Sequence, residues 1–339
     1  MGAPWVSWLR QTAAATAAAV ALVAAVALVA AVALAAAVAW PLAATTAALS
    51  ASRLRRTLGT AAEMGSISIA GSGTAIEEEH RSALDALARC KPQAVVFDAA
   101  QYDPHAVAEA REMWRTRMRA EHESVPVLAA LATQLIEAGA TLDTQAVVLR
   151  MAIDEIRHAE ICGEAVRALG GEPSCEINEP PTLPRFRSVS AEERALRNVI
   201  FGHALVETVN TAQLVDILDT MSDPYLREAT RRLLADEVRH AAFGFEYLAA
   251  WKPWLDGHPE ARQSLTRYLR SAFAELERVR SGSALPPRHR TADEVALGIG
   301  DPARITVVFH QTVEGAIVPA LEAFGLDAGS SWRARSAGT

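Results

Sequence analysis

Two six-residue segments of the chain are almost identical and combine residue types that bind metal ions. Residues 154–159 read Asp-Glu-Ile-Arg-His-Ala and residues 236–241 read Asp-Glu-Val-Arg-His-Ala, so five of six residues agree at an offset of 82. In each segment a Glu and a His lie three residues apart, which places them on one face of an α-helix, where both can bind the same ion. The repeat predicts a site with approximate twofold symmetry.

The apolar residues around both segments predict that these Glu and His side chains face the interior of a helical protein. The first series is Met151, Glu155, His158, Cys162, Val166 and Leu169, and the second is Leu233, Glu237, His240, Gly244 and Tyr247. Carboxylates that are buried without a partner are very unfavourable. We therefore expect cations between the two helices.

Each neighbouring helix is expected to supply one further carboxylate. Glu207 lies on an apolar stripe 30 residues before Glu237. Before the first segment, Glu121 and Glu123 are both candidates; we choose Glu121 because its helix face is almost wholly apolar, whereas that of Glu123 is more polar. The predicted metal ligands, which are also the predicted catalytic residues, are Glu121, Glu155, His158, Glu207, Glu237 and His240.

The composition of this ligand set indicates which metals it suits. Four ionised carboxylates are balanced in charge by two divalent cations. Carboxylate oxygens with one imidazole per metal suit iron or manganese better than an ion that prefers thiolates. We expect two iron ions, with manganese as the alternative. A pair of such ions can deliver electrons to dioxygen.

Start and stop signals predict four long helices that position these ligands. The start signals are Asp103-Pro104, the capping box of Ser190 with Glu193, and Asp223-Pro224, and the stop signals are Gly139 and Gly170-Gly171. These residues are typical of helix N-caps, first helical positions and C-termini. The predicted helices span about 104–138, 141–170, 191–220 and 224–250.

The lengths of the connections predict how these helices are arranged. Only a few residues join the first helix to the second and the third to the fourth, so each pair should form an antiparallel hairpin. The link of some 20 residues between the hairpins can reach about 66 Å, farther than the roughly 42 Å of a 28-residue helix. The predicted fold class is all-α, a four-helix bundle of two antiparallel hairpins with one long crossover. Further helices near 258–280 and 302–325 are expected to pack outside the bundle.

The ligand pattern resembles that of the ferritin-like di-iron carboxylate proteins, which is Glu, Glu-x-x-His, Glu, Glu-x-x-His. More narrowly, Glu121-His122-Glu123-Ser124 followed by the first six-residue segment is similar to a group of uncharacterised bacterial ferritin-like domain proteins. The resemblance covers about residues 104–250. It implies a dimetal centre, most often di-iron, that reacts with dioxygen or peroxide. The long N-terminal run and the C-terminal helices depart from ferritins, so iron storage in a cage is not implied.

The resemblance also assigns roles to residues beside the ligands. It implies that Asp154 orients His240 and that Asp236 orients His158, contacts that fix the tautomer and basicity of each imidazole. His203 lies on the stripe of the third helix. We favour a hydrogen-bonded core histidine there over a seventh ligand or a proton donor.

Four further residues near the ligands have simpler expected roles. Arg157 and Arg239 point away from the Glu/His face and are expected to form ion pairs or lie at the surface. Cys162 lies one turn from the first histidine, and Tyr247 lies two turns from the second. We expect both to pack in the core rather than to line a substrate cavity or to relay electrons.

The N-terminal part of the chain is unlike the rest. Residues 13–39 consist of Ala, Val and Leu apart from Thr16, and the uncharged run extends beyond residue 49. A hydrophobic helix over residues 13–49 is long enough to span a bilayer, and the arginines that follow it would place the remaining chain on the cytoplasmic side. A cleaved signal peptide and a true start at Met64 are the alternatives. Without this run, the protein is expected to be cytoplasmic.

The chain is therefore predicted to contain four regions. These are a hydrophobic Ala/Val-rich segment at 1–60 that is a membrane anchor or leader, a linker with a short helix at 61–103, the ferritin-like dimetal bundle at 104–250, and a C-terminal helical extension at 251–339. The net charge of −7 argues against a nucleic-acid binder. Three cysteines without a CxxC pair argue against a cysteine-based zinc or iron–sulfur site.

These observations lead to one main functional hypothesis, a dinuclear-metal oxidoreductase that activates dioxygen to oxidise or oxygenate a small organic substrate. Its expected partners are that substrate, dioxygen or peroxide, and an external electron donor. The alternative hypothesis is a ferroxidase, peroxide scavenger or iron-handling protein. A third is a membrane-tethered helical bundle whose metal site is structural or vestigial.

Overall fold

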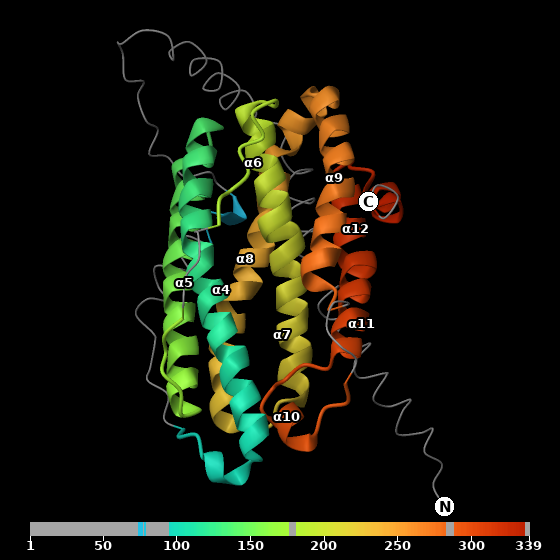
Figure 1. Cartoon of the computed structure of the whole chain (residues 1–339). Helices are drawn as coiled ribbons and strands as arrows, with labels where there is room; N and C mark the ends of the chain where they lie inside the picture. The colour runs from blue at the N-terminus through green and yellow to red at the C-terminus, as the bar shows by residue number, and fades with distance from the viewer. Residues whose placement is uncertain (1–73, 77, 79–94, 176–180, 283–287, 336–339) are drawn as a thin grey trace, which may run out of the picture.

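The computed structural model describes residues 74–76, 78, 95–175, 181–282 and 288–335. Within these ranges the chain forms helices and connections but no strand, so the predicted all-α fold class is confirmed (Figure 1). The hydrophobic run at 13–49 and Met64 lie outside the described residues. Among the helices that are described, none combines the length and apolarity that a membrane span requires.

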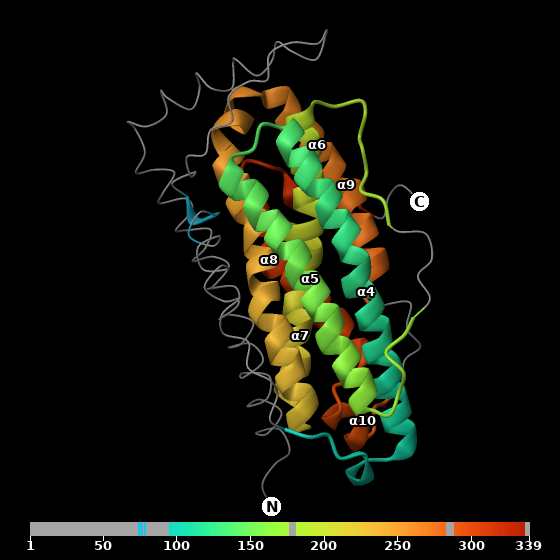
Figure 2. The ribbon, with the colours of Figure 1, turned by 90° about the vertical axis from the view of Figure 1, so that its left-hand side faces the viewer.

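Four long helical rods pack together as two hairpins (Figures 1 and 2). The rods are α4 (Pro104–Glu137), α5 (Leu142–Ala168), the continuous run of α6 (Ala191–Val199), η3 (Ile200–Glu207) and α7 (Thr208–Thr220), and α8 (Pro224–Gly257). α4 packs along α5, and α8 packs along η3 and α7. Contacts of α5 with α8 and of α4 with α6 join the two hairpins.

The helix starts follow the predicted capping residues. Asp103 accepts hydrogen bonds from the backbone of the first turn of α4, and Asp223 does so at α8. The Ser190 hydroxyl accepts from the backbone N–H of Glu193 at 3.2 Å, but the predicted capping box is only half formed. The Glu193 carboxylate instead binds the Arg197 guanidinium, because a charged partner one turn away is a stronger donor than a backbone N–H.

Two helices differ from the prediction in shape or length. The segment 191–220 was expected to be one regular helix, but η3 is π-helical, which inserts an extra residue into the middle of the rod. α8 continues to Gly257 instead of ending near residue 250. It runs through Pro253 because Leu248 and Leu255 on either side are fully buried, so tertiary packing outweighs the lost backbone hydrogen bond.

The C-terminal helices form a layer against the α6–η3–α7 rod (Figure 1). They are α9 (Pro259–Arg280), α10 (Ala292–Ala296), α11 (Pro302–Thr312), η4 (Val313–Ile317), α12 (Val318–Ala323) and α13 (Ala328–Ala334). A short turn of 3-10 helix, η2 (Ala99–Gln101), precedes α4. The layer lies outside the two hairpins, as expected, but Phe273, Phe309 and Trp332 belong to the same apolar cluster as residues of η3 and α8.

The apolar core is split into two clusters along the length of the rods. Cluster 1 includes Leu135, Met151, Ile200, Phe243 and Leu269. Cluster 2 includes Trp114, Met118, Cys162, Leu226 and Leu233. On α4, α5 and α8 the predicted metal ligands fall in sequence between residues of the two clusters, whereas on the third rod Glu207 lies between Leu205 and Val209 of cluster 1. The predictions that Cys162 and Tyr247 pack in the core are confirmed, because both are fully buried.

Candidate metal centre

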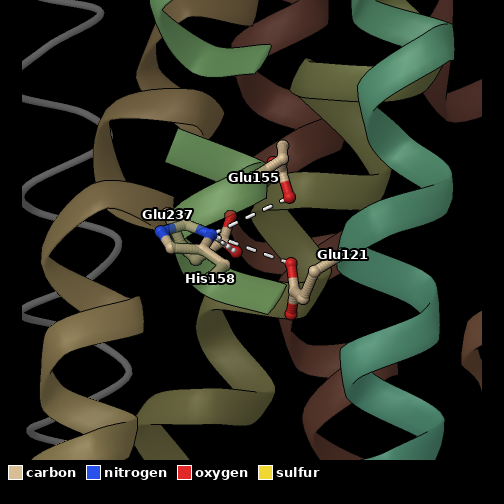
Figure 3. Close-up of side chains that lie close together, drawn as sticks. All are labelled: Glu121, Glu155, His158 and Glu237. Atoms are coloured by element: carbon tan, nitrogen blue, oxygen red, sulfur yellow. Dashed lines mark ion pairs between the residues drawn. The ribbon is translucent and has the colours of Figure 1, made fainter. Parts of the chain in front are cut away.

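The structure brings the six predicted ligands together as two overlapping groups. Donor atoms of the first group, Glu121, Glu155, His158 and Glu237, all lie within 4.8 Å of one another, and the same holds for the second group, Glu155, Glu207, Glu237 and His240. Two residues, Glu155 and Glu237, belong to both groups. Figure 3 shows the first group, with the Glu121, Glu155 and Glu237 carboxylates directed at the His158 ring. We refer to the six residues as the Glu/His cluster.

Each rod contributes to the cluster at the same depth. Glu121 comes from α4, Glu155 and His158 from α5, Glu207 from the end of η3, and Glu237 and His240 from α8. The three-residue spacing in α5 and α8 stacks each Glu beside its His, as expected on one helix face. His158 Nδ1 lies 3.4 Å from Glu237 Oε1, and His240 Nδ1 lies 3.2 Å from Glu155 Oε1. Each imidazole therefore contacts the glutamate of the other hairpin.

Several polar atoms of the cluster have no hydrogen-bond partner among the described residues. They are Glu155 Oε2, His158 Nδ1, Glu237 Oε2 and His240 Nε2. The side chains that carry them are nearly or completely buried. Buried polar atoms are almost always satisfied in folded proteins. Three of the four, all except His240 Nε2, belong to the inner side of the cluster, and a cation bound there would satisfy them.

An aspartate lies beside the Nε2 atom of each imidazole. His158 Nε2 lies 3.2 Å from Asp236 Oδ2, within reach of a hydrogen bond. His240 Nε2 lies 3.7 Å from Asp154 Oδ2, which is too long for a direct hydrogen bond. Both rings therefore turn Nδ1 toward the cluster and Nε2 toward an aspartate of the opposite hairpin. An imidazole that donates Nε2–H to a carboxylate presents the Nδ1 lone pair to a metal.

Arginines surround the two aspartates. Arg157 bridges them, with contacts to Asp236 and, at 3.2 Å, to Asp154 Oδ1, while Arg239 also binds Asp236. The prediction that both arginines form ion pairs is confirmed. Burial raises the pKa of Asp236, but His158 and the two arginines outweigh burial and hold this pKa well below its usual range.

Arg150 is a buried partner that the sequence analysis missed. Its Nε donates to Asp154 Oδ1 at 3.1 Å, one helical turn away. Burial raises the pKa of Asp154, but contacts with His240 and Arg150 outweigh burial, and the net shift is downward. The i, i+4 spacing of Arg150 and Asp154 was the available signal.

Burial and mutual contacts set the charges of the shared carboxylates and the imidazoles. Burial raises the pKa values of Glu155 and Glu237, but hydrogen bonds from the two imidazoles outweigh it and hold both below their usual range. Burial lowers the pKa values of His158 and His240, yet the surrounding carboxylates raise both well above the usual value. Without a metal, these four groups form buried ion pairs.

The two remaining carboxyls behave differently. Burial raises the pKa of Glu121 to about 7, and burial together with the charges of the neighbouring glutamates raises the pKa of Glu207 well above its usual value. At a pH below about 7, the metal-free cluster therefore holds four protons, one on each imidazole and one on each of these carboxyls. Two divalent cations can replace four protons without changing the net charge of the site, which is a second sign that the residues fit a metal pair.

Glu121 and Glu207 are also the less buried members of their groups. The Glu121 side chain is 12 % exposed, and Asn210 donates to Glu207 at 3.4 Å. The rival candidate Glu123 lies outside the cluster, with Oε1 3.9 Å from Arg119 Nε. The polar face on which Glu123 lies therefore remains outside the site, as the choice of Glu121 anticipated.

His203 lies beside the cluster without joining either donor group. Its Nδ1 is 3.1 Å from the backbone carbonyl oxygen of His240, and burial lowers its pKa to about 4. A neutral, hydrogen-bonded core histidine is the role that the sequence analysis favoured. Gly244 allows this contact, because a Cβ there would lie 2.4 Å from the backbone nitrogen of Ala204. The close approach of α8 and η3 thus depends on a glycine.

Fold and site together define an all-helical protein with a buried carboxylate–histidine cluster that could hold metal ions. In comparisons with known proteins, no family model, no curated protein and no solved structure matches the chain.

Proposed function

We propose that this chain is a dinuclear-metal oxidoreductase built on a ferritin-like four-helix bundle, and that it activates dioxygen or peroxide to oxidise a small organic substrate. The observation that supports this most directly is the sharing of Glu155 and Glu237 between two four-residue donor groups. A carboxylate has two oxygens, so each shared glutamate can bind one ion with each oxygen and hold two ions close together. A site for a single ion needs no such sharing.

The donor set favours iron, with manganese as the alternative. Each ion would have one imidazole, one unshared carboxylate and two shared carboxylates. Oxygen-rich sites with one nitrogen suit these metals, and no sulfur atom is in either group. When bound, such a pair supplies electrons to dioxygen or peroxide. An external electron donor would have to return those electrons, because the two groups of metal ligands contain no redox-active side chain.

The chain's own residues have separate tasks in this mechanism. Glu155 and Glu237 would be shared by the two ions, and the hydrogen bond with Asp236 would hold His158 in the tautomer that binds metal. The apolar clusters on either side exclude water along the bundle axis. Glu121 and Glu207 are the least buried ligands, so a substrate would approach from their side of the site. As the protonated carboxyls of the metal-free chain, they would release their protons when ions bind.

Metal content and an optical spectrum test the proposal together. The full chain is reconstituted anaerobically with Fe(II), its iron is measured, and the spectrum is followed after oxygen is added. We expect about two ions per chain and a transient absorbance change, with no metal in a Glu155→Gln/Glu237→Gln control. Fewer than about one ion per chain under all conditions would contradict a dinuclear site. Retention of a growing ferric core would instead identify an iron-handling protein.

A further inference from the structure

A row of aromatic side chains runs along α8 from the Glu/His cluster toward its C-terminal end. We call it the α8 ladder; it consists of Phe243, Tyr247, Trp251, Trp254 and His258. The spacing of three or four residues keeps these rings on one face of the helix. Successive ring centroids lie 5.9, 5.8, 5.8 and 4.3 Å apart, so each ring contacts the next.

The inner end of the ladder is coupled to a metal ligand. The ring of His203 lies 5.1 Å from that of Phe243, centroid to centroid. The same His203 is hydrogen-bonded through Nδ1 to the backbone carbonyl of His240. The contact path from the ligand His240 into the ladder is therefore continuous.

The outer end of the ladder opens at the surface. A pocket of about 420 Å³ is lined by Trp254 and His258 together with polar residues of α6 and α9. Both rings are partly exposed and stacked on each other at an interplanar angle of 18°. Three glutamates line the pocket wall, and one of them, Glu193, is paired with Arg197, so Glu192 and Glu260 remain against Arg267. Such a pocket suits a small neutral or cationic molecule better than an anion.

Distance explains why a ladder is useful here. His240 and Trp254 are 14 residues apart, which corresponds to about 21 Å along the helix. Electron tunnelling through protein falls exponentially with distance, so one step of this length is slow, whereas shorter steps through an easily oxidised ring between the two ends are fast. Trp251 is such a ring: it lies 11 residues, about 16 Å along the helix, from His240, and 3 residues, about 4.5 Å, from Trp254.

The chemistry of the rings indicates which of them hold charge. Phenylalanine and histidine are hard to oxidise, and the Tyr247 hydroxyl has no hydrogen-bond partner among the described residues that could take its proton. An indole can lose one electron while it keeps its proton. Trp251 and Trp254 are therefore the carriers, and Phe243 and Tyr247 are the packed medium between Trp251 and the cluster.

We propose that the α8 ladder delivers electrons to the Glu/His cluster from a small neutral or cationic one-electron donor bound in this pocket. The inference rests on the proposed function, because an oxidised metal ion in the cluster is the electron acceptor. Trp251 gives one electron to an ion that dioxygen or peroxide, the co-reactant of the proposed function, has oxidised strongly enough to oxidise an indole, and Trp251 becomes a radical cation, which Trp254 reduces. The donor then reduces the Trp254 radical cation and leaves as its own one-electron oxidised form. No proton or atom is transferred, and two donors restore two electrons.

The first test measures electron entry directly. The iron-loaded chain is mixed with hydrogen peroxide and tetramethyl-p-phenylenediamine, a small donor whose one-electron oxidised form is coloured, and the formation of that coloured form is followed optically. We expect Trp251→Phe and Trp254→Phe to slow this oxidation of the donor by about tenfold or more, and the control Trp332→Phe to change it by less than about twofold. Trp332 packs against Phe273 and Phe309, away from the ladder. Equal rates in all four proteins would overturn the proposal.

A second test needs no variant and so does not depend on how the variants fold. The iron-loaded wild-type chain is treated with hydrogen peroxide without any donor, and oxygen added to each tryptophan is located by mass spectrometry. We expect modification of Trp251 and Trp254 to exceed that of Trp332 by about fivefold or more, and to need bound iron. Uniform modification would overturn the ladder alone. A chain that binds no metal would instead overturn the proposed function and, with it, the electron acceptor.

Discussion

At the scale of single residues, the cluster distinguishes two kinds of carboxylate. Glu155 and Glu237 belong to both donor groups, whereas Glu121 and Glu207 belong to one each. We predict that Glu155→Gln or Glu237→Gln lowers the bound metal from about two ions to fewer than about 0.3 per chain, because each removes a ligand from both sites. Glu121→Gln or Glu207→Gln should leave about one ion. Elemental analysis of the purified variants measures this.

The matched control for this series is Glu123→Gln. Glu123 is two residues from Glu121 but its carboxylate is 3.9 Å from Arg119 and outside both groups. Its substitution should leave the metal content unchanged. If all four cluster variants retained the same metal content, the distinction between shared and unshared carboxylates would be wrong.

The protons of the metal-free cluster predict how metal binding depends on pH. The imidazoles have pKa values well above the usual value and the Glu121 pKa is about 7, so near neutrality the imidazoles of the metal-free chain are protonated and Glu121 is about half protonated. A metal needs them deprotonated, so binding releases protons and affinity must rise with pH. We expect the dissociation constant to fall by about tenfold or more between about pH 6 and 7.5. Calorimetry in two buffers with different ionisation enthalpies counts the released protons.

The Glu121→Gln variant tests whether metal binding releases protons and therefore strengthens as pH rises. It cannot hold the Glu121 proton and is expected to bind about one ion instead of two, so it should release fewer protons per chain than the wild type. Metal affinity that is flat over this pH range, or that falls as pH rises, would show that the cluster is not protonated in the way described.

At the scale of helices, the approach of α8 to η3 positions two sides of the cluster. A Cβ at Gly244 would lie 2.4 Å from Ala204 N and 2.8 Å from Ala204 Cα, and backbone atoms cannot move aside as a side chain can. We predict that Gly244→Ala destabilises the chain by about 1–3 kcal/mol. Because η3 ends at Glu207, it should also weaken metal binding by about tenfold. Urea unfolding and metal titration measure the two effects.

Gly202→Ala is the matched control for this prediction. Gly202 is also in the η3–α8 region, but a Cβ there would have no neighbour within 4 Å. Its replacement should leave metal binding unchanged and, because alanine favours helical backbone, should not destabilise the chain. If both variants bound metal as the wild type does, the close helix contact would not position the site.

Sequence patterns located the rods but not their irregularities. Repeated segments, N-cap aspartates and glycine stops are local signals, and they placed α4, α5 and the start of α8 within a few residues. The π-helical segment η3 was not predicted from local sequence. It packs against α8, α9 and η4, and these tertiary contacts cannot be read from the residues of the segment itself. The short helices α10 and α13 were likewise unpredicted, since tertiary contacts determine whether five to seven residues form a helix.

The six ligands show the same division between local and tertiary information. The Glu-x-x-His pairs could be read from spacing, and Glu121 could be chosen over Glu123 from the polarity of its face. Arg150, which binds Asp154, was missed because a buried arginine is rare and its i, i+4 pairing resembles an ordinary surface ion pair. Only packing reveals that this pair is buried.

At the scale of the whole molecule, the Glu/His cluster forms a polar layer between two apolar clusters. Cluster 1 and cluster 2 lie on opposite sides of it, and all four rods pass through it. In the metal-free chain the layer contains two buried carboxyls, two partly buried carboxyls and two buried imidazoles, and some of their polar atoms have no hydrogen-bond partner among the described residues. This layer contributes less to stability than an apolar layer of the same size, because desolvation of charged groups offsets much of their attraction. Bound metal ions would connect the two helix hairpins through Glu155 and Glu237.

This arrangement predicts that metal binding stabilises the whole fold and not only the site. Ligands come from all four rods, so the ions bind the folded chain and not the unfolded one. At a free Fe(II) or Mn(II) concentration about 100 times the dissociation constant, the gain is about 2.7 kcal/mol for each filled site, and each filled site should raise Tm by roughly 5–10 °C for a domain of this size. Anaerobic thermal unfolding followed by circular dichroism measures the rise, and Glu155→Gln/Glu237→Gln, which lacks both shared ligands, should show none. An equal rise in the Tm of the variant would mean that the metals bind elsewhere. If neither metal raised the Tm of the wild-type chain, the proposal that ions bind between the two apolar clusters would be wrong.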